Sequence, residues 1–539
     1  MLKKSIKYLI LINTISLTLN AQSLYNKTAY ITSQCYTKTV DDNNQKHNPC
    51  YSCHTKNKEP NFTFEDDDLQ ESYAFPASAL KNPWTNLFKD RTKDVAKISD
   101  KQILKYVNEN NYNDKNNQII LKQKLQKIQW RGYIPDCEFS FDKDGFDRKN
   151  NTEYTLWRAF AYYPFLGTFW PTNGSTDDVL IRLAKEFSLD KNGQFDLETY
   201  KLNLSIVESL IKQKSIKIDV VDENKYQVDL NQNGKLDKAN SIVFKWETPS
   251  YDIKNNRFYN YTMSYVGMAK TKLELGKTNI APGLYPVWTE FLHSVRYLSI
   301  DSNNNVKMAS RMKELRYAKK TRWFNYSQLK SIGINTLKEK YDFPDRTEQY
   351  LGDSEIGLNT KRGWYYQGFI EDKEGELRAQ NYEETLYCMG CHSNLGATID
   401  STFVFGRKFE KDIVQNSWYH WSQKGFKNIP DKKLENNETE YTKYLKNNNS
   451  GDEFRTNDEV KKKFFKDGIL IKKSIDILKK DISYLLIPSV KRAIQLNKAY
   501  KVIVDEQSFI YGRDAHIKPT INVHKKLTDN QSTHLEKKD

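Results

Sequence analysis

Four of the six cysteines in this 539-residue chain lie in two short segments, and each segment pairs two thiols with an imidazole. The segments are Cys50-Tyr-Ser-Cys53-His54 and Cys388-Met-Gly-Cys391-His392. Residues i and i+3 share one face of a helical turn, so both sulfurs of a pair can reach the same molecule. The sequence therefore predicts two sites at which one bound group meets two thiols and one imidazole.

Haem c attachment accounts for this spacing better than zinc or a disulfide does. A zinc site needs four ligands, and each segment supplies at most three. A disulfide within each pair leaves the repeated histidine unexplained. We predict two covalently bound haem c groups, with thioether bonds at the cysteines and iron bonds at the histidines. The residues are Cys50, Cys53, Cys388 and Cys391 for attachment, and His54 and His392 as proximal iron ligands.

The N-terminus has the features of a secretory signal peptide over residues 1–21. Three lysines precede an apolar stretch at residues 8–19, and Ala21 provides a small residue at the cleavage position. The stretch is too short to span a bilayer, and no later segment is long and apolar enough. Cys35 is too far from the cleavage position to carry a lipid. We therefore expect a periplasmic or secreted protein with no transmembrane span after signal removal.

The formal net charge of +15 has two interpretations. It indicates either a solvated lysine-rich surface or a surface that docks to an acidic redox partner, because charge raises the encounter rate. Nucleic acid is excluded as a partner by the export signal.

Together, the two Cys-x-x-Cys-His segments and the export signal resemble those of bacterial c-type cytochromes. They also resemble, more distantly, the dihaem peroxidases and their oxygenase relatives. The resemblance implies a periplasmic dihaem protein that transfers electrons. Two alternatives are a dihaem oxidoreductase, peroxidase- or oxygenase-like, with one haem as the reaction centre, and a module that docks to a larger redox complex.

The sixth ligand of each iron would separate a carrier from an enzyme, because an open position binds peroxide or oxygen. His420 lies in an aromatic stretch, and His293 lies in a predicted strand. Both are candidates for a distal ligand, and both also fit ordinary structural roles.

A loop in the middle of the chain matches much of a calcium-binding pattern. Oxygen-bearing side chains occur at the first, third, fifth and ninth positions, and Gly234 occupies the sixth. Position twelve is Asn240 rather than glutamate. The loop is either a weak structural calcium site or an Asn-Gly hairpin turn. The candidate ligands are Asp229, Asn231, Asn233 and Asp237.

The pattern of elements predicts a mixed α+β fold. Helical haem-binding segments near the N-terminus and in the C-terminal third flank a central region of strands and hairpins. A capping box at Ser99 predicts a helix near residue 100, the run from Ser175 predicts a second helix, and an apolar stripe after Pro488 predicts a third. The predicted divisions are 1–21 signal peptide, 22–140 first haem segment, 141–375 central α+β region, 376–430 second haem segment, 431–460 polar loop or linker, and 461–539 C-terminal helical segment ending in a disordered tail from residue 525.

Two cysteines remain outside the two segments. In an oxidising compartment, Cys35 and Cys137 could form a disulfide; the alternative is two unpaired buried thiols.

Overall fold

The computed structural model describes residues 26–56, 58–62, 71–150, 152–165, 171–413, 417–434, 436–448 and 457–535. The predicted signal peptide at residues 1–21 lies outside these residues, as does part of the predicted polar loop at 431–460.

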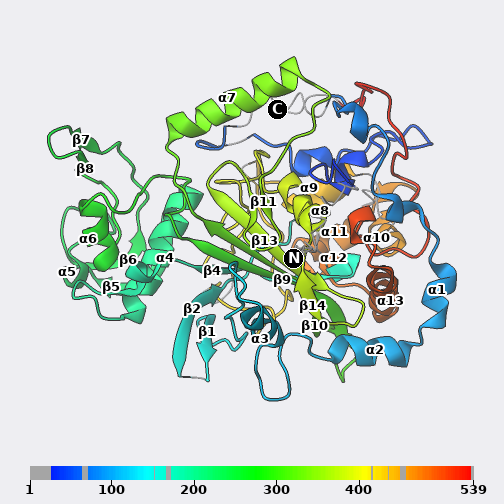
Figure 1. The fold of residues 1–539 in the computed structure, drawn as a ribbon, viewed down its shortest axis with the longest axis horizontal. Coiled ribbons are helices and arrows are strands. Elements are labelled where there is room, and N and C mark those ends of the chain that lie inside the picture. The colour runs from blue at the N-terminus through cyan, green and yellow to red at the C-terminus, as the bar shows by residue number, and fades with distance from the viewer. Residues whose placement is uncertain are drawn as a thin grey trace, which may run out of the picture.

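The centre of the described chain is one ten-stranded antiparallel sheet (Figure 1). Its main strand order is β1-β2-β4-β9-β10-β13-β12-β11, with β3 paired to β9 and β14 paired to β13. The predicted mixture of helices and strands is confirmed at this level. The strands are β1 (Phe146–Lys149), β2 (Glu153–Ala159), β3 (Thr176–Asp177), β4 (Leu180–Arg182), β9 (Glu290–Ile300), β10 (Val306–Lys320), β11 (Gly352–Asp353), β12 (Gly357–Asn359), β13 (Trp364–Glu371) and β14 (Leu377–Ala379).

Smaller hairpins lie outside this sheet. They are β5 (Ile216–Asp222) with β6 (Lys238–Ile242), β7 (Ser250–Asp252) with β8 (Arg257–Tyr259), and β15 (Phe465–Lys466) with β16 (Ile469–Leu470). The first two, together with α4, α5 and α6, form the lobe at the left of Figure 1.

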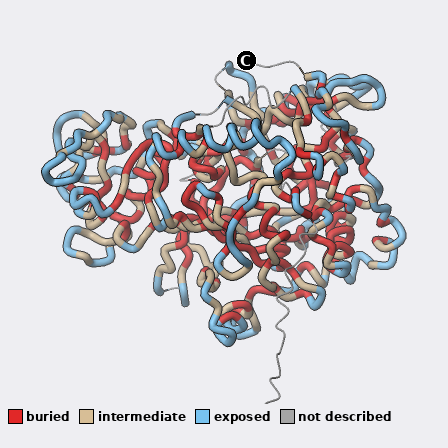
Figure 2. Tube along the Cα trace, turned by 45° about the horizontal axis from the view of Figure 1, so that its top comes forward, coloured by how far each residue is buried: buried red, intermediate tan, exposed pale blue. Residues whose placement is uncertain are grey.

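Helices surround the sheet, and the buried residues concentrate between them (Figures 1 and 2). They are α1 (Thr92–Lys97), α2 (Asp100–Asn108), α3 (Ile120–Lys127), α4 (Leu197–Lys212), α5 (Glu223–Tyr226), α6 (Met268–Glu274), α7 (Tyr326–Asp342), α8 (Tyr382–Leu386), α9 (Glu440–Asn447), α10 (Asp458–Phe464), α11 (Lys472–Leu478), α12 (Ser483–Leu486) and α13 (Val490–Glu506).

Two of the three predicted helices form where the sequence places them. Ser99 caps α2 in a reciprocal capping box with Gln102. In α13 the predicted stripe is buried at Ala493, Leu496 and Tyr500, and the helix packs against strand β9 and helices α1 and α2. Local capping chemistry and helical periodicity were sufficient to predict both.

The helix predicted from Ser175 is wrong, because this stretch forms β3 and β4 instead. Both strands pair with β9, with Thr176 opposite Arg296 and Leu180 opposite Leu292. Between them the Asp178 carboxylate accepts hydrogen bonds from the backbone and hydroxyl of Ser294. Pairing with a distant strand overrides the local helical pattern.

The predicted disordered tail is also wrong for residues 525–535. Lys526 forms a β-bridge with Lys81, Ser532 forms one with Ser72, and Leu527 is buried. Residues 526–532 are therefore packed against residues 72–81.

Candidate functional site

The two Cys-x-x-Cys-His segments adopt the same tight turn. In the first, at η2 (Cys50–Ser52), the Cys50 carbonyl accepts hydrogen bonds from the backbone of Cys53 at 3.0 Å and His54 at 2.8 Å. In the second, at η8 (Tyr387–Gly390), the Cys388 carbonyl accepts from Cys391 at 3.3 Å and His392 at 3.0 Å. The repeated pattern in the sequence therefore corresponds to a repeated local geometry.

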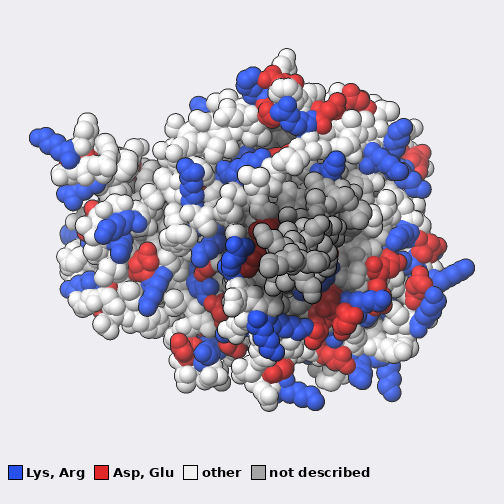
Figure 3. All heavy atoms as spheres, viewed as in Figure 1, with Lys and Arg blue, Asp and Glu red and all other residues white. Residues whose placement is uncertain are grey.

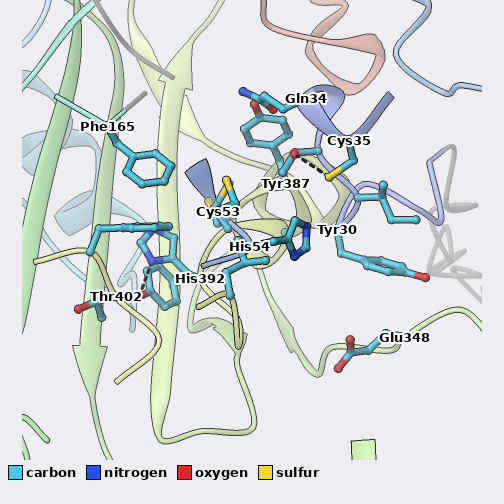
Figure 4. A pocket seen from close by; sticks show the side chains of 18 of the residues that line it. Tyr30, Gln34, Cys35, Cys53, His54, Phe165, Glu348, Tyr387, His392 and Thr402 are labelled. Carbon is cyan, nitrogen blue, oxygen red and sulfur yellow. Dashed lines mark hydrogen bonds between the residues drawn. The ribbon is translucent and has the colours of Figure 1, made fainter. Parts of the chain in front are cut away.

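Both turns line one cavity of about 890 Å³ (Figure 4). The backbone of Ala397, which follows the second turn, donates to the Cys53 carbonyl of the first at 3.1 Å. Gly390 allows the N-terminal segment to pass close by, because a Cβ there would lie 2.4 Å from the Tyr30 carbonyl oxygen. The fold thus places the two segments around a common space.

The imidazole of His392 is held by the sheet. The Tyr366 hydroxyl lies 3.0 Å from Nδ1, and the Ser401 carbonyl lies 3.3 Å from the same nitrogen. Burial lowers the pKa of His392 to about 3. The ring is therefore neutral at physiological pH, and Tyr366 and Ser401 fix its orientation in the cavity wall.

His54 lines the same cavity, whose wall also includes Ile332, Thr336 and Lys340 of α7. Burial, assisted by the nearby ammonium of Lys340, lowers its pKa to about 4. This second imidazole is also neutral near pH 7.

Burial raises the pKa of all the cavity thiols. The pKa of Cys50 and that of Cys391 are each raised to about 12, and the pKa values of Cys53 and Cys388 are also raised. The thiolate is the nucleophilic form of cysteine, so these sulfurs are weak nucleophiles at neutral pH. The arrangement does not suit disulfide exchange.

Cys35 also lines this cavity, although the sequence gave it no such role. Its sulfur lies 3.5 Å from the Thr32 hydroxyl. Cys137 belongs to a separate buried cluster beneath the sheet. Both are free thiols, so the predicted disulfide between them is wrong.

The rest of the cavity wall is mostly apolar and aromatic, with a few charged groups. On the sheet side His293 Nε2 lies 3.9 Å from the Asp177 carboxylate, and both residues face the cavity. Burial raises the pKa of Asp177 to about 7 and lowers that of His293 to about 4. Other lining residues, from distant parts of the chain, are Phe160, Phe165, Phe291, Arg316, Ala318, Tyr366, Phe403 and Arg407.

His293 and His420, the two candidate distal ligands, occupy different places. His293 lines the cavity from β9, whereas His420 is absent from the cavity lining. His420 Nε2 lies 2.9 Å from Asp178, and the ring stacks on Phe141 with centroids 4.5 Å apart. These contacts give His420 a structural role beside the sheet.

The predicted calcium loop lies in the small lobe and is closed by its own hydrogen bonds. The Asp229 carboxylate accepts from the backbone of Asn233 and Gly234. The side-chain amides of Asn231 and Asn233 donate to Asp237. Polar side chains here stabilise a turn, as Asx residues commonly do.

No local signal in the sequence identified several cavity residues. Tyr366, Arg316 and Ala318 lie on strands more than twenty residues from either segment, and each is brought in by strand pairing. Strand alternation combined with the pairing register would have grouped them, but the register is not readable from one sequence.

Comparison with known proteins identifies the family. Residues 19–480 match a family model whose description reads "-like lipoprotein". The chain belongs to this lipoprotein family. An "Uncharacterized lipoprotein" from Aquifex aeolicus (strain VF5) is 29% identical over 554 aligned positions, covering 91% of this chain and 86% of the relative. No solved structure matches.

The family membership overturns the interpretation of the chain as a c-type cytochrome. The matching family and the matching relative are both described as lipoproteins and not as cytochromes. The predicted function in electron transfer is therefore wrong. The two alternatives, a peroxidase- or oxygenase-like enzyme and a docking module of a redox complex, are wrong for the same reason.

The predicted cofactors are corrected as well. Within the described residues, no three or more His, Cys, Asp and Glu side chains form a group that could hold a metal ion. The two haem c groups and the calcium ion are therefore not retained. At the calcium loop the Asp229 and Asp237 carboxylates accept hydrogen bonds from amide donors of the loop itself, which stabilise it as a turn.

The family supports the coarser expectation of a cell-envelope protein. Among the described residues, none of the helices has the length and apolar character needed to cross a membrane.

Proposed function

We propose that the protein is a binding protein of the cell envelope and that its cavity takes a bulky, largely apolar organic ligand. The observation that carries this proposal is that two segments 338 positions apart in sequence, 388 − 50, contribute matching turns to one cavity of about 890 Å³. Ligand sites are typically concave and mostly apolar, with a few polar groups that fix orientation.

The proposed contact residues are the thiols and imidazoles of the two segments. The neutral His54 and His392 rings and the protonated thiols suit an apolar ligand, because none of them brings a charge into the cavity. Asp177, His293 and Arg316 supply a polar region on the sheet side.

We place the binding protein on the periplasmic or outer side of the envelope. The predicted export signal and the lipoprotein family support this location. Two expectations stay predictions: Cys35 carries no lipid, and the protein has an acidic partner. On the face drawn in Figure 3, basic and acidic side chains are interspersed, which favours a solvated lysine-rich surface over a docking patch for an acidic protein partner.

Probe binding and mass spectrometry test the proposal. The neutral dye Nile red should bind the purified protein with increased fluorescence, and Ala318→Phe should weaken this binding at least about tenfold, because the new ring fills the cavity from β10. Ala96→Phe adds the same ring at an exposed position of α1 and should bind the dye like the wild type. Equal binding by both variants would contradict the proposal.

Thiol counting reports how a natural ligand is held. The purified protein is analysed by native mass spectrometry and its absorption spectrum, then denatured, treated with a disulfide reductant and alkylated. Alkylation of all six cysteines would mean reversible binding, and fewer would mean that a ligand is bonded to sulfur.

A further inference from the structure

Helix α7 has two faces with different surroundings. It spans Tyr326–Asp342, and only Leu329 and Gly333 are fully buried within it. In both Figure 1 and Figure 2 it lies along the outside of the molecule. Its attachment is concentrated at its start, where the Tyr326 hydroxyl donates to the Pro282 carbonyl and Leu329 packs against Ala281 and Leu284.

One face of α7 forms part of the cavity wall. Ile332, Thr336 and Lys340 line the cavity at a spacing of four residues. With about 100° between successive residues, these three side chains share one side of the helix.

The opposite face carries an exposed apolar stripe formed by Ile334, Leu337 and Tyr341. Their exposed fractions are 47%, 38% and 86%. Spacings of three and four residues place the three side chains within about 60° of one another. Lys330 lies one turn before Ile334 on the same face and is exposed.

We propose that the outward stripe of α7 docks onto the surface of an anionic phospholipid bilayer. Insertion of a few apolar side chains beside a lysine is how amphipathic helices bind at the headgroup boundary. The net charge of +15 becomes +12 without the three lysines of the predicted signal peptide (15 − 3), and this positive charge favours an anionic surface. Three side chains are too few for a protein interface, which typically needs about 1,000 Å² of buried surface.

The docked helix places the cavity beside the bilayer, because the same helix forms its wall. The ligand is then a membrane-soluble apolar molecule that enters past α7. This part rests on the proposed ligand binding, whereas docking itself rests only on the stripe and the charge.

Vesicle flotation tests the docking. The purified full chain should float with vesicles of phosphatidylcholine and phosphatidylglycerol, and less with phosphatidylcholine alone. The variant Ile334→Ser/Leu337→Ser/Tyr341→Ser should lose at least about tenfold of the bound fraction. A control variant, Ile128→Ser/Ile253→Ser/Ile521→Ser, removes three exposed apolar side chains elsewhere and should float like the wild type.

The charge and the occupant are tested separately. Lys330→Gln should weaken binding to the phosphatidylglycerol vesicles and leave binding to neutral vesicles unchanged. Equal flotation of the stripe variant and the wild type overturns the proposal. So does a wild-type dimer, seen by light scattering, that the stripe variant dissociates, since a second copy then covers the stripe.

Nile red binding without vesicles distinguishes this failure from failure of the proposed function. The stripe variant should bind the dye as the wild type does, because the stripe faces away from the cavity. Dye binding by neither protein would refute the cavity proposal, whereas normal dye binding with unchanged flotation would refute the docking.

Discussion

The central strands β9, β10 and β13 have one packed face and one face that lines the cavity. On the packed face Leu292, Leu315 and Phe369 join a closed cluster with α3. On the other face His293, lying opposite Arg316, borders the cavity. Adjacent residues of the same strands thus serve different purposes, because successive side chains point to opposite faces of a sheet.

The packed cluster and the cavity therefore lie on opposite faces of the same strands and not in separate domains. The packed face stabilises the sheet, and the cavity face is then free to carry polar and small side chains. Substitutions on the two faces should therefore have different consequences.

Substitutions on the packed face should cause the largest loss of stability. Phe369→Ala should lower the free energy of unfolding by about 3–5 kcal/mol, because it leaves a cavity in a fully buried cluster. Chemical denaturation measures this loss. Phe258→Ala, at an exposed position of β8, should change stability by less than about 0.5 kcal/mol. A small loss at Phe369 would mean that the packed face is not closed.

Two alanines of β10 should respond differently to the same enlargement of the side chain. Ala309 lies in the cluster beneath α13, and Ala318 borders the cavity, although both are nearly inaccessible to solvent. Ala309→Leu should lower the free energy of unfolding by about 1–3 kcal/mol, because the larger side chain overpacks this cluster. Ala318→Leu should cost less than about 1 kcal/mol, because its side chain has space to enter, and it should weaken Nile red binding. Equal costs by chemical denaturation would break the distinction between the two faces.

Acid should destabilise the cavity side. Burial lowers the pKa values of His392 and His54 to about 3 and about 4, against an ordinary value of 6.5. The unfolded chain therefore binds protons first as the pH falls below about 6.5, and the free energy of unfolding decreases until the folded-state pKa values are reached. Each histidine should contribute less than about 1.4 kcal/mol per pH unit, because water enters the open cavity.

Denaturation midpoints measured between about pH 7 and pH 5 check this slope. The variant His392→Gln should show a shallower slope than the wild type, whereas His534→Gln, at the chain end, should not change it. An unchanged slope in His392→Gln would show that this imidazole is accessible to protons in the folded protein.

The smallest expected effect is at the contact between the sheet and the second turn. Tyr366→Phe removes the hydroxyl that lies 3.0 Å from His392 Nδ1. This substitution should lower the free energy of unfolding by about 1 kcal/mol. The same change should raise the mobility of the imidazole, seen as line broadening of its NMR signals. Tyr365→Phe alters the neighbouring residue on the opposite face of β13 and should leave the His392 signals unchanged.

Prediction from sequence succeeded where the physical cause is local. The capping box at Ser99 and the stripe of α13 depend on neighbours within one or two helical turns. It failed at β3 and β4, where the partner is β9, more than one hundred residues away. The cytochrome interpretation failed for a different reason, because two five-residue segments are too short to identify the family of a 539-residue chain.

The sequence by itself determined the two matching turns at Cys50 and Cys388, because their hydrogen bonds close within five residues. Only the tertiary structure decided that both turns line one cavity, that His293 joins them and that His420 does not. The pairing of β9, β10 and β13 sets which side chains share a face, and that register depends on contacts between distant residues.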